Sequence, residues 1–271
     1  MLGKQLRSKV SKLFNSRAAY STLGALTLAL VAGPAQGSIN LVTNGGFEQT
    51  LLPVATQFGD RYPQQQVLGW TTDSYSFVFT PGSADFGGAT DEYFLDDEET
   101  IPEQIMLWGP HNGSANGLPA TSPVGGNFLG ADGAYLPGKI SQVINGLNPG
   151  HAATVSFYWA GAQQYTYDGD STERWIVSLG EETQETAAYH NRDHGFSGWM
   201  HQTFTFTPAH STETLSFLAL GTPDFTVPPF SLLDGVSVTT PEPGVWGMGV
   251  ALFAALGLCT RLRRKASSSA A

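Results

Sequence analysis

Residues 153–159 read Ala-Thr-Val-Ser-Phe-Tyr-Trp, and this stretch is the strongest indication of the fold. Val155, Phe157 and Trp159 alternate with more polar residues, and a period of two places the two sets on opposite faces of a β-strand. The same alternation recurs at residues 140–144, 203–207, 215–219 and 230–238. Many short strands bounded by Asn, Gly and Pro indicate an all-β protein, and specifically a single β-sandwich of the jelly-roll type.

We expect this sandwich to occupy residues 38–240, with further strands at 68–79 and 175–179. Residues 80–126 break the pattern, because they are rich in Gly, Pro, Asn, Ala and Asp and include an acidic patch at 91–99. The composition predicts a long irregular insertion, the least ordered part of the domain. Connections of this length inside one domain are unusual and often functional.

The charge of the chain is distributed very unevenly. Of its 13 Lys and Arg residues, five lie in residues 1–17 and four in 261–265. Residues 38–240 hold the other four together with 22 of the 23 acidic residues, so the formal charge of this body is −18. Such a body repels nucleic acid and attracts divalent cations. The single cysteine, Cys259, lies outside the body, which therefore has neither a disulfide nor a catalytic thiol.

The N-terminus has the three parts of a secretory signal peptide. A positive region precedes an apolar stretch from Leu23 to Ala32, and Ala35-Gln36-Gly37 offers small residues for cleavage before Ser38. Residues 1–37 are therefore expected to form a signal-peptide helix that is removed on export. An uncleaved membrane anchor is the alternative. The basic residues are Lys4, Arg7, Lys9, Lys12 and Arg17.

The C-terminus resembles the PEP-CTERM sorting signal of bacteria that carry an exosortase. Pro241, Glu242 and Pro243 precede an apolar run at 244–258, which is shorter than the ~20 residues of a comfortable transmembrane helix. A basic cluster follows, formed by Arg261, Arg263, Arg264 and Lys265. The resemblance covers 241–265, with 266–271 as a disordered tail. It implies a hydrophobic helix held briefly in the inner membrane, an exosortase-type processing enzyme as partner, and release to the cell surface or extracellular matrix.

Two segments of the body carry a second resemblance. Residues 40–48, Asn-Leu-Val-Thr-Asn-Gly-Gly-Phe-Glu, and residues 228–238, Pro-Pro-Phe-Ser-Leu-Leu-Asp-Gly-Val-Ser-Val, resemble the first and last strands of galactose-binding-like jelly rolls, the fold of many carbohydrate-binding modules. In that family a Glu of the first motif and an Asp of the last strand share a structural Ca²⁺. The resemblance places this role on Glu48 and Asp234.

The residues themselves give some support to a calcium site. Asp234 is expected on one face with Leu232 and Val236, and a carboxylate among apolar residues has to be paired or coordinated. Ca²⁺ takes six to eight oxygen ligands, including backbone carbonyls. Family members often carry a second acidic residue after the Asp, whereas this chain has Gly235. The alternative is an Asp that accepts backbone hydrogen bonds.

Two other groups of residues are weaker metal candidates. Asp168, Asp170 and Glu173 look like part of a calcium loop but lack the full EF-hand spacing, and a polar hairpin explains them as well. A zinc site would need converging ligands, and solvated loop histidines are the alternative. The candidate zinc ligands are His190, His194 and His201, near Asp193.

Several aromatic residues lie beside amides and carboxylates, as a glycan-binding surface requires. Sugars stack their C–H faces on exposed rings while polar groups bind the hydroxyls. A sandwich core that needs Trp and Tyr in any case is the alternative. The candidates are Tyr158, Gln163, Gln164, Tyr165, Tyr167 and Trp175.

Together these observations predict an exported surface or matrix protein that is non-enzymatic and binds polysaccharide. The sequence contains neither the Gly-x-Ser-x-Gly elbow nor a phosphate-binding loop. Two alternatives stay open: a glycan hydrolase that uses an Asp/Glu pair, and a purely structural surface protein.

Overall fold

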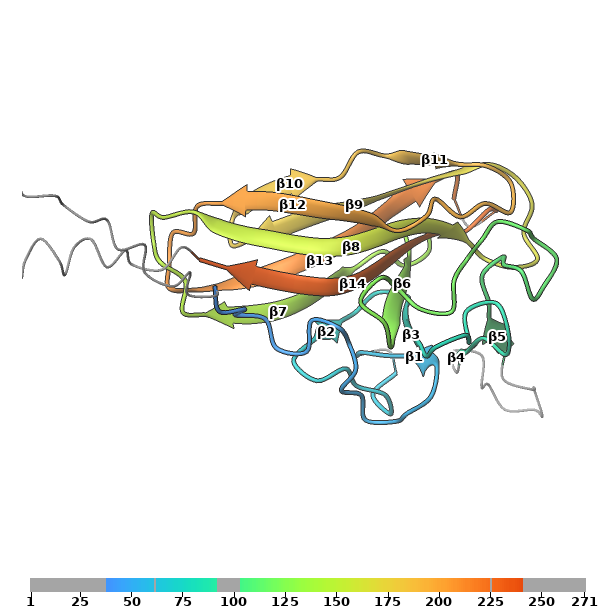
Figure 1. Ribbon diagram of the computed structural model, residues 1–271, viewed down its shortest axis with the longest axis horizontal. Coiled ribbons are helices and arrows are strands. Elements are labelled where there is room, and N and C mark those ends of the chain that lie inside the picture. Colours follow the sequence, from blue (N-terminus) through green and yellow to red (C-terminus); the bar gives the residue numbers. More distant parts are fainter. Residues whose placement is uncertain (1–37, 61, 92–102, 225, 241–271) are drawn as a thin grey trace, which may run out of the picture. The chain divides into compact units, whose positions relative to one another are not determined.

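The computed structural model describes residues 38–60, 62–91, 103–224 and 226–240, and every regular element within these ranges is a β-strand (Figure 1). No helix long and apolar enough to cross a bilayer occurs among them. The all-β fold predicted from the alternating segments is therefore confirmed. The predicted signal-peptide and sorting helices fall outside the described residues.

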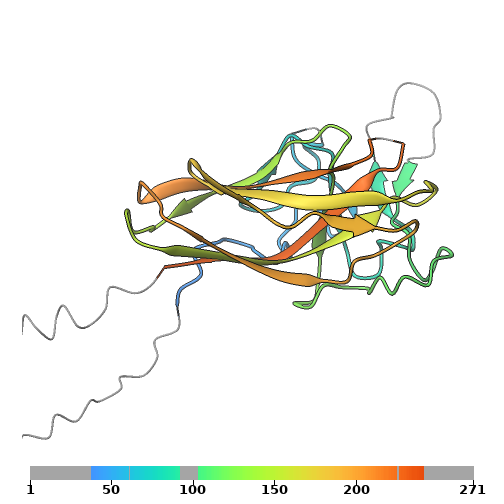
Figure 2. The same cartoon turned by 90° about the horizontal axis from the view of Figure 1, so that it is seen from above.

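The strands form two sheets that face each other as a sandwich (Figures 1 and 2). The eight-stranded sheet has the order β12 (Met200–Phe206), β8 (Ala153–Gln163), β14 (Pro229–Thr239), β6 (Phe128–Asp132), β3 (Ser76–Phe79), β1 (Thr56–Gln57), β4 (Ala89–Asp91) and β5 (Glu103–Ile105). The second sheet has the order β10 (Glu182–Glu185), β9 (Ser171–Leu179), β13 (Thr212–Thr222), β7 (Lys139–Asn145) and β2 (Thr71–Thr72), with β11 (Tyr189–Asn191) also paired to β9. From β6 to β9 and from β12 to β14, successive strands alternate between the sheets, which gives the jelly-roll connectivity.

The main hydrophobic core fills the space between the two sheets. Phe217 of β13 lies at its centre, with ring centroids 5.1 Å from Phe157, 6.0 Å from Trp175 and 6.2 Å from Trp70. All four side chains are buried. Burial of this aromatic surface is a major source of stability in a domain that has no cysteine.

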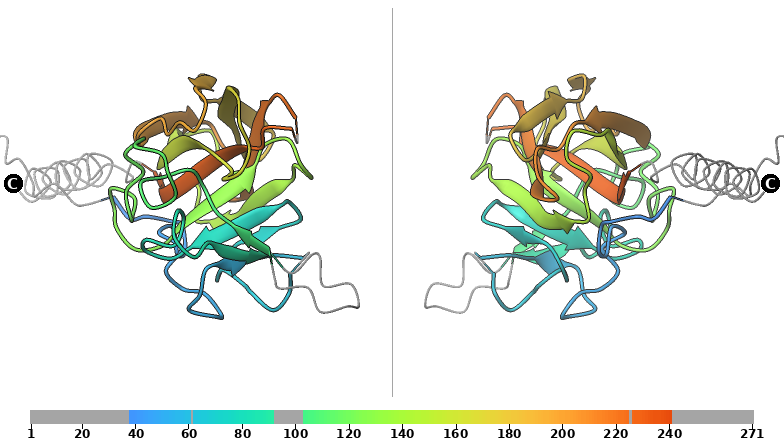
Figure 3. Two further views of the ribbon diagram at one scale, coloured as in Figure 1. Left: turned by 90° about the vertical axis from the view of Figure 1, so that its right-hand side faces the viewer. Right: turned by 90° about the vertical axis from the view of Figure 1, so that its left-hand side faces the viewer.

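A second core covers the outer face of the eight-stranded sheet, and this was not expected from the sequence. Leu107 and Leu118, from residues 80–126, pack with Phe79, Phe128 and Phe230 in one buried cluster. In Figure 3 the cyan and green segments before residue 127 lie beside this sheet. The segment also contributes β4 and β5. The predicted insertion is therefore not irregular throughout. Strands that are apolar on both faces need a cover on each, and this segment covers the outer one. Residues 92–102, which include most of the acidic patch, lie outside the described residues.

The first and last described segments lie side by side. The N–H of Leu41 donates to the carbonyl of Val238 at 2.8 Å, and the Asn40 side chain accepts from the N–H of Val238 at 3.0 Å. The two ends of the sandwich chain therefore meet at one end of β14, at the left of Figure 1.

Candidate functional site

The structure brings the two predicted calcium ligands together around Gly46. A Cβ at Gly46 would lie 3.9 Å from both Asp234 Oδ1 and Glu48 Cγ. Asp234 is fully buried, with Ser122 Oγ donating to Oδ2 and the Gly235 N–H donating to Oδ1 at 2.6 Å. Glu48 is exposed, and its Oε1 accepts from the N–H of Asn127 at 2.9 Å.

The electrostatics of this pair favour a cation. Burial raises the pKa of Asp234 to about 7, against the lowering effect of the Ser122 and Gly235 donors, and the charge of Glu48 raises it further. Neither carboxylate forms an ion pair with a basic side chain in the part of the chain that the structure describes. Two carboxylates that repel each other across a glycine turn fit the preference of Ca²⁺ for oxygen ligands. Occupancy by calcium stays a prediction.

Asp234 does not share its face with Val236, contrary to the expectation. The pairing of β14 with β8 shifts register between Asp234 and Ser237, and Gly235 has a φ of 60°. This bulge turns Val236 into the core between the sheets, whereas Leu232 packs on the outer face. The positive φ favours glycine over a residue with a side chain at this position.

Two of the predicted glycan-binding residues are inaccessible, so their assignment is wrong. Trp175 is fully buried between the sheets, and its indole N–H donates to the carbonyl of Leu232 at 3.0 Å. Gln163 is also fully buried, where its Nε2 donates to the Gly169 carbonyl at 2.9 Å and to Ser171 Oγ at 2.7 Å. Both side chains serve the packing of the sandwich.

Tyr165 and Tyr167 lie at the surface, and the structure adds Trp108 to them. The ring centroids of Trp108 and Tyr165 are 4.7 Å apart, edge to face, and the Trp108 indole N–H donates to the Tyr167 carbonyl at 2.8 Å. All three residues are partly exposed. Residues 106–108 lie alongside the chain just beyond the end of β8. The N–H of Tyr165 donates to the Met106 carbonyl at 2.8 Å, and Leu107 forms an antiparallel bridge with Gln164.

Carboxylates and histidines surround this aromatic group. His194 Nε2 lies 2.6 Å from Asp168 Oδ1 and 3.3 Å from Asp193 Oδ1, and its ring stacks on Trp108 with centroids 3.7 Å apart. His190 Nε2 lies 3.5 Å from Asp170 Oδ2. We call Trp108, Tyr165, Tyr167, Asp168, Asp193 and His194 the loop-end surface, which lies toward the right of Figure 1.

Neither of the two weaker metal sets assembles as the sequence grouped it. Glu173 is fully buried inside the sandwich, away from its exposed neighbours Asp168 and Asp170. His201 lies on β12, where its ring is 4.8 Å from that of Tyr158. The structure instead combines one member of each set, Asp168 and His194, with Asp193.

Tyr158 is separate from the loop-end surface. It lies seven residues before Tyr165 and pairs with Asp234 across β8 and β14. Its side chain is partly exposed on the outer face of the eight-stranded sheet.

Sequence reasoning missed Trp108 and Phe86, an aromatic residue that is 72% exposed and whose ring lies 6.0 Å from that of His111. Both sit in the segment assigned to an irregular insertion. Both aromatic residues stand in a stretch rich in Gly, Pro and Asn, outside any alternating pattern that would place them in the core. This isolation is the feature of the sequence that could have identified them.

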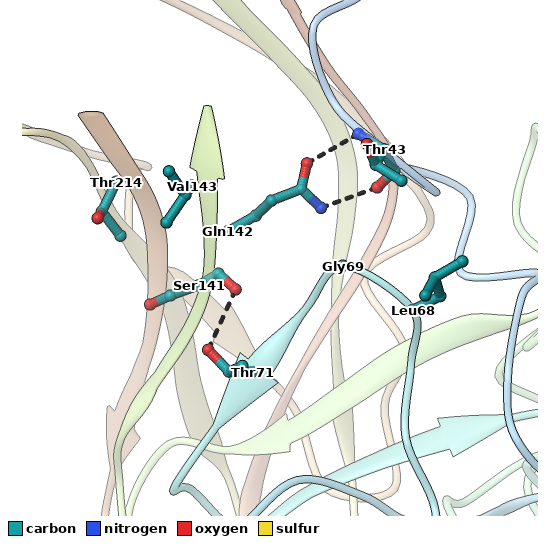
Figure 4. Close-up of a pocket in the computed structure, with 8 residues that line it drawn as sticks. All are labelled: Thr43, Leu68, Gly69, Thr71, Ser141, Gln142, Val143 and Thr214. Carbon is teal, nitrogen blue, oxygen red and sulfur yellow. Dashed lines mark hydrogen bonds between the residues drawn. The ribbon is translucent and has the colours of Figure 1, made fainter. Parts of the chain in front are cut away.

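A pocket of about 550 Å³ lies elsewhere, on the outer side of the smaller sheet (Figure 4). Its lining is Thr43, Leu68, Gly69, Thr71, Ser141, Gln142, Val143 and Thr214. The Gln142 amide accepts from the N–H of Thr43 at 2.7 Å and donates to the Thr43 carbonyl at 2.8 Å. A second pocket, of about 380 Å³, shares Leu68, Gly69 and Thr71 and adds Asp60. Asp60 is the one acidic residue in the lining of these two pockets. A glycoside hydrolase needs two carboxylates, so neither pocket holds such a pair.

No protein-family model matches this chain, and no curated protein matches it. Solved structures similar to it include TmCBM61 in complex with β-1,4-galactotriose, at 13% identity over 75% of this chain and 100% of that one, with a TM-score of 0.38. The CBM22-1 xylan-binding domain of Xyn10C from Paenibacillus barcinonensis has 12% identity over 75% of this chain and 100% of its own, with a TM-score of 0.32. The K1 adhesin domain of Lys-gingipain from Porphyromonas gingivalis W83 has 12% identity over 72% of this chain and 99% of its own, with a TM-score of 0.35.

Proposed function

We propose that this chain is an exported surface protein that binds polysaccharide through its loop-end surface. The observation that carries the proposal is the gathering of Trp108, Tyr165 and Tyr167 at the surface instead of in the core. The rings come from two segments far apart in the sequence, and carboxylates border them. Rings that offer apolar faces beside oxygen acceptors match the two needs of a sugar, a stacking platform and partners for its hydroxyls.

Retention on immobilised polysaccharides tests this proposal. Tyr165→Ala and Tyr167→Ala should each weaken retention about tenfold or more, which corresponds to about 1.4 kcal/mol of binding free energy. Tyr158→Ala is the matched control, because it removes a partly exposed tyrosine from a different surface and should leave retention unchanged. Failure to bind any polysaccharide, the producer's own exopolysaccharide included, would contradict the proposal.

The export route is a second part of the proposal, and it rests on the two ends of the sequence. Positive charge at residues 4–17 and 261–265 favours the cytoplasmic side for both ends, with the acidic body outside. An exosortase-type enzyme would then act near Pro241-Glu242-Pro243. The hydrogen bonds between the first and last described segments agree with processing at both ends, because the chain enters and leaves the sandwich at one place.

A structural calcium at Glu48 and Asp234 is the third part. A cation bound there would stabilise the ionised form of Asp234 and tie the first segment of the domain to its last strand. Ser122 and Asn127 hold the two carboxylates, so the site also anchors the end of the segment that covers the outer face.

A further inference from the structure

Three metal-ligating groups converge at the loop-end surface. Asp168 Oδ1, Asp193 Oδ1 and His194 Nε2 all lie within 4.8 Å of one another. They come from two loops, one after β8 and one after β11. Ligand atoms of a tetrahedral metal site lie about 3–3.5 Å apart, as follows from metal–ligand bonds of about 2 Å, so small shifts of exposed side chains would close this group around an ion.

The histidine is positioned from outside this group. Its ring stacks on Trp108 at an interplanar angle of 28°. Ser114 Oγ and Asn116 Nδ2 donate to its carbonyl at 2.8 and 3.0 Å. These three residues belong to a third segment, residues 108–116, which thereby directs the Nε2 edge of the ring toward the carboxylates. Fixing a ligand through neighbours that do not bind the ion is how metal sites are oriented.

The neighbouring loop holds Asp193 in a similar way. The N–H of Gly169 donates to Asp193 Oδ1 at 2.6 Å, and the N–H of Asp193 donates to Asp170 Oδ1 at 3.0 Å. The side chains of Asp168, Asp193 and His194 are 79%, 49% and 30% exposed, so water can reach the group. An ion held here would keep open coordination positions.

We propose that Asp168, Asp193 and His194 bind a divalent transition-metal ion of the zinc type, at a site separate from the Glu48–Asp234 pair. One imidazole nitrogen and two carboxylate oxygens suit Zn²⁺, whereas Ca²⁺ and Mg²⁺ prefer oxygen alone. The −18 charge of the body raises the local concentration of such ions.

Titration of the untagged, chelator-treated protein with Zn²⁺ tests this, with heat and bound metal measured together. We expect one Zn²⁺ per chain at this site, with Ca²⁺ failing to compete at equal concentration. His194→Gln and Asp168→Asn should each weaken Zn²⁺ binding at least tenfold. Co²⁺ provides a second probe, since its visible absorption reports a nitrogen- and oxygen-ligated site directly.

Matched variants of the same loops serve as controls. His190→Gln removes the imidazole of the adjacent His–Asp pair, and Asp234→Asn removes the predicted calcium ligand; both variants should keep Zn²⁺ binding. Circular dichroism identifies any variant that fails to fold, and for such a variant the Co²⁺ absorption of the wild-type protein serves as the readout instead. Absence of Zn²⁺ uptake, or uptake unchanged in both His194→Gln and Asp168→Asn, would overturn the site. Polysaccharide retention in the presence of chelator is a separate readout, so the two proposals fail independently.

Discussion

Among single residues, Glu173 has the most unusual environment. It is fully buried, Ser171 Oγ donates to its Oε1, and its Oε2 has no hydrogen-bond partner in the described structure. Gly161 stands opposite, where a Cβ would come within 2.5 Å of Oε2. Burial raises the pKa of Glu173 to about 8, although Ser171 and Asn191 lower it. The carboxyl group is therefore mostly protonated at neutral pH.

This carboxyl group should make the stability of the fold depend on pH. Between its unfolded pKa, 4.5, and its folded pKa, about 8, the unfolded chain releases the proton that the folded chain keeps, so stability falls as the pH rises. Glu173→Gln removes this effect. Urea unfolding should show equal stability of variant and wild type at pH 4, and a variant more stable by over about 1 kcal/mol at pH 8. Parallel pH profiles for the two proteins would contradict the assignment.

The calcium prediction can be tested at a second single residue, Asp234. Ca²⁺ at 100 times its Kd should increase the free energy of unfolding by about 2.7 kcal/mol and so raise the melting temperature. A chelator should reverse the effect. Asp234→Ala should abolish the difference measured by calorimetry. Asp132→Asn is the control. Asp132 is also buried, and burial raises its pKa to about 6, but among the described residues its carboxylate accepts from the Ala134 and Tyr135 N–H groups of its own turn. Equal melting temperatures with and without Ca²⁺ would remove the metal and leave the fold intact.

Among the secondary-structure elements, the long strands were predictable and the short ones were not. Residues 153–159 show their alternation because one side of β8 faces the core and the other does not. β1, β2, β4 and β5 have two or three residues each, which is too short for a period to appear. Their positions depend on pairing with other strands, since β1 pairs with β3 and β4, β2 with β7, and β4 with β5.

The candidate site was predictable in part for a similar reason. Tyr165, Tyr167 and Asp168 are close in sequence, so a single hairpin identified them. Trp108 and Asp193 join them only through the fold, and no local pattern links them. Trp175 could have been excluded, because it shares the parity of Val177 and Leu179, which face the core.

The bulge in β14 predicts how a substitution at Gly235 affects the stability of the domain. Gly235→Ala should destabilise the domain by about 1–2 kcal/mol, because the added Cβ meets a positive φ and lies 3.1 Å from the Tyr158 ring. Gly150→Ala is the matched control: its φ is 72°, but a Cβ there meets nothing within 4 Å. Chemical unfolding should therefore show a larger loss for Gly235→Ala. An equal loss in the two variants would mean that the ring contact is unimportant.

For the whole molecule, the prediction concerns the mature chain. Intact mass spectrometry of protein from the cell surface or medium should show that residues 1–37 are absent and that the chain ends close to Pro241-Glu242-Pro243. Replacement of this tripeptide by Ala-Ala-Ala should leave a longer, membrane-associated form. A main species that still carries residues 1–37 and 244–271 would contradict the export route.

The course of β14 has a consequence for how such a protein would stand on a cell. The strand begins at Pro229, which pairs with Gln163 beside the loop-end surface, and ends at Thr239, which pairs with Thr154 next to the meeting point of the two chain ends. Ten steps of about 3.3 Å separate these points by about 33 Å. Whatever holds the chain at its C-terminal end would therefore lie about 33 Å from the loop-end surface. The sandwich would act as a rigid spacer between the point of attachment and the bound polysaccharide.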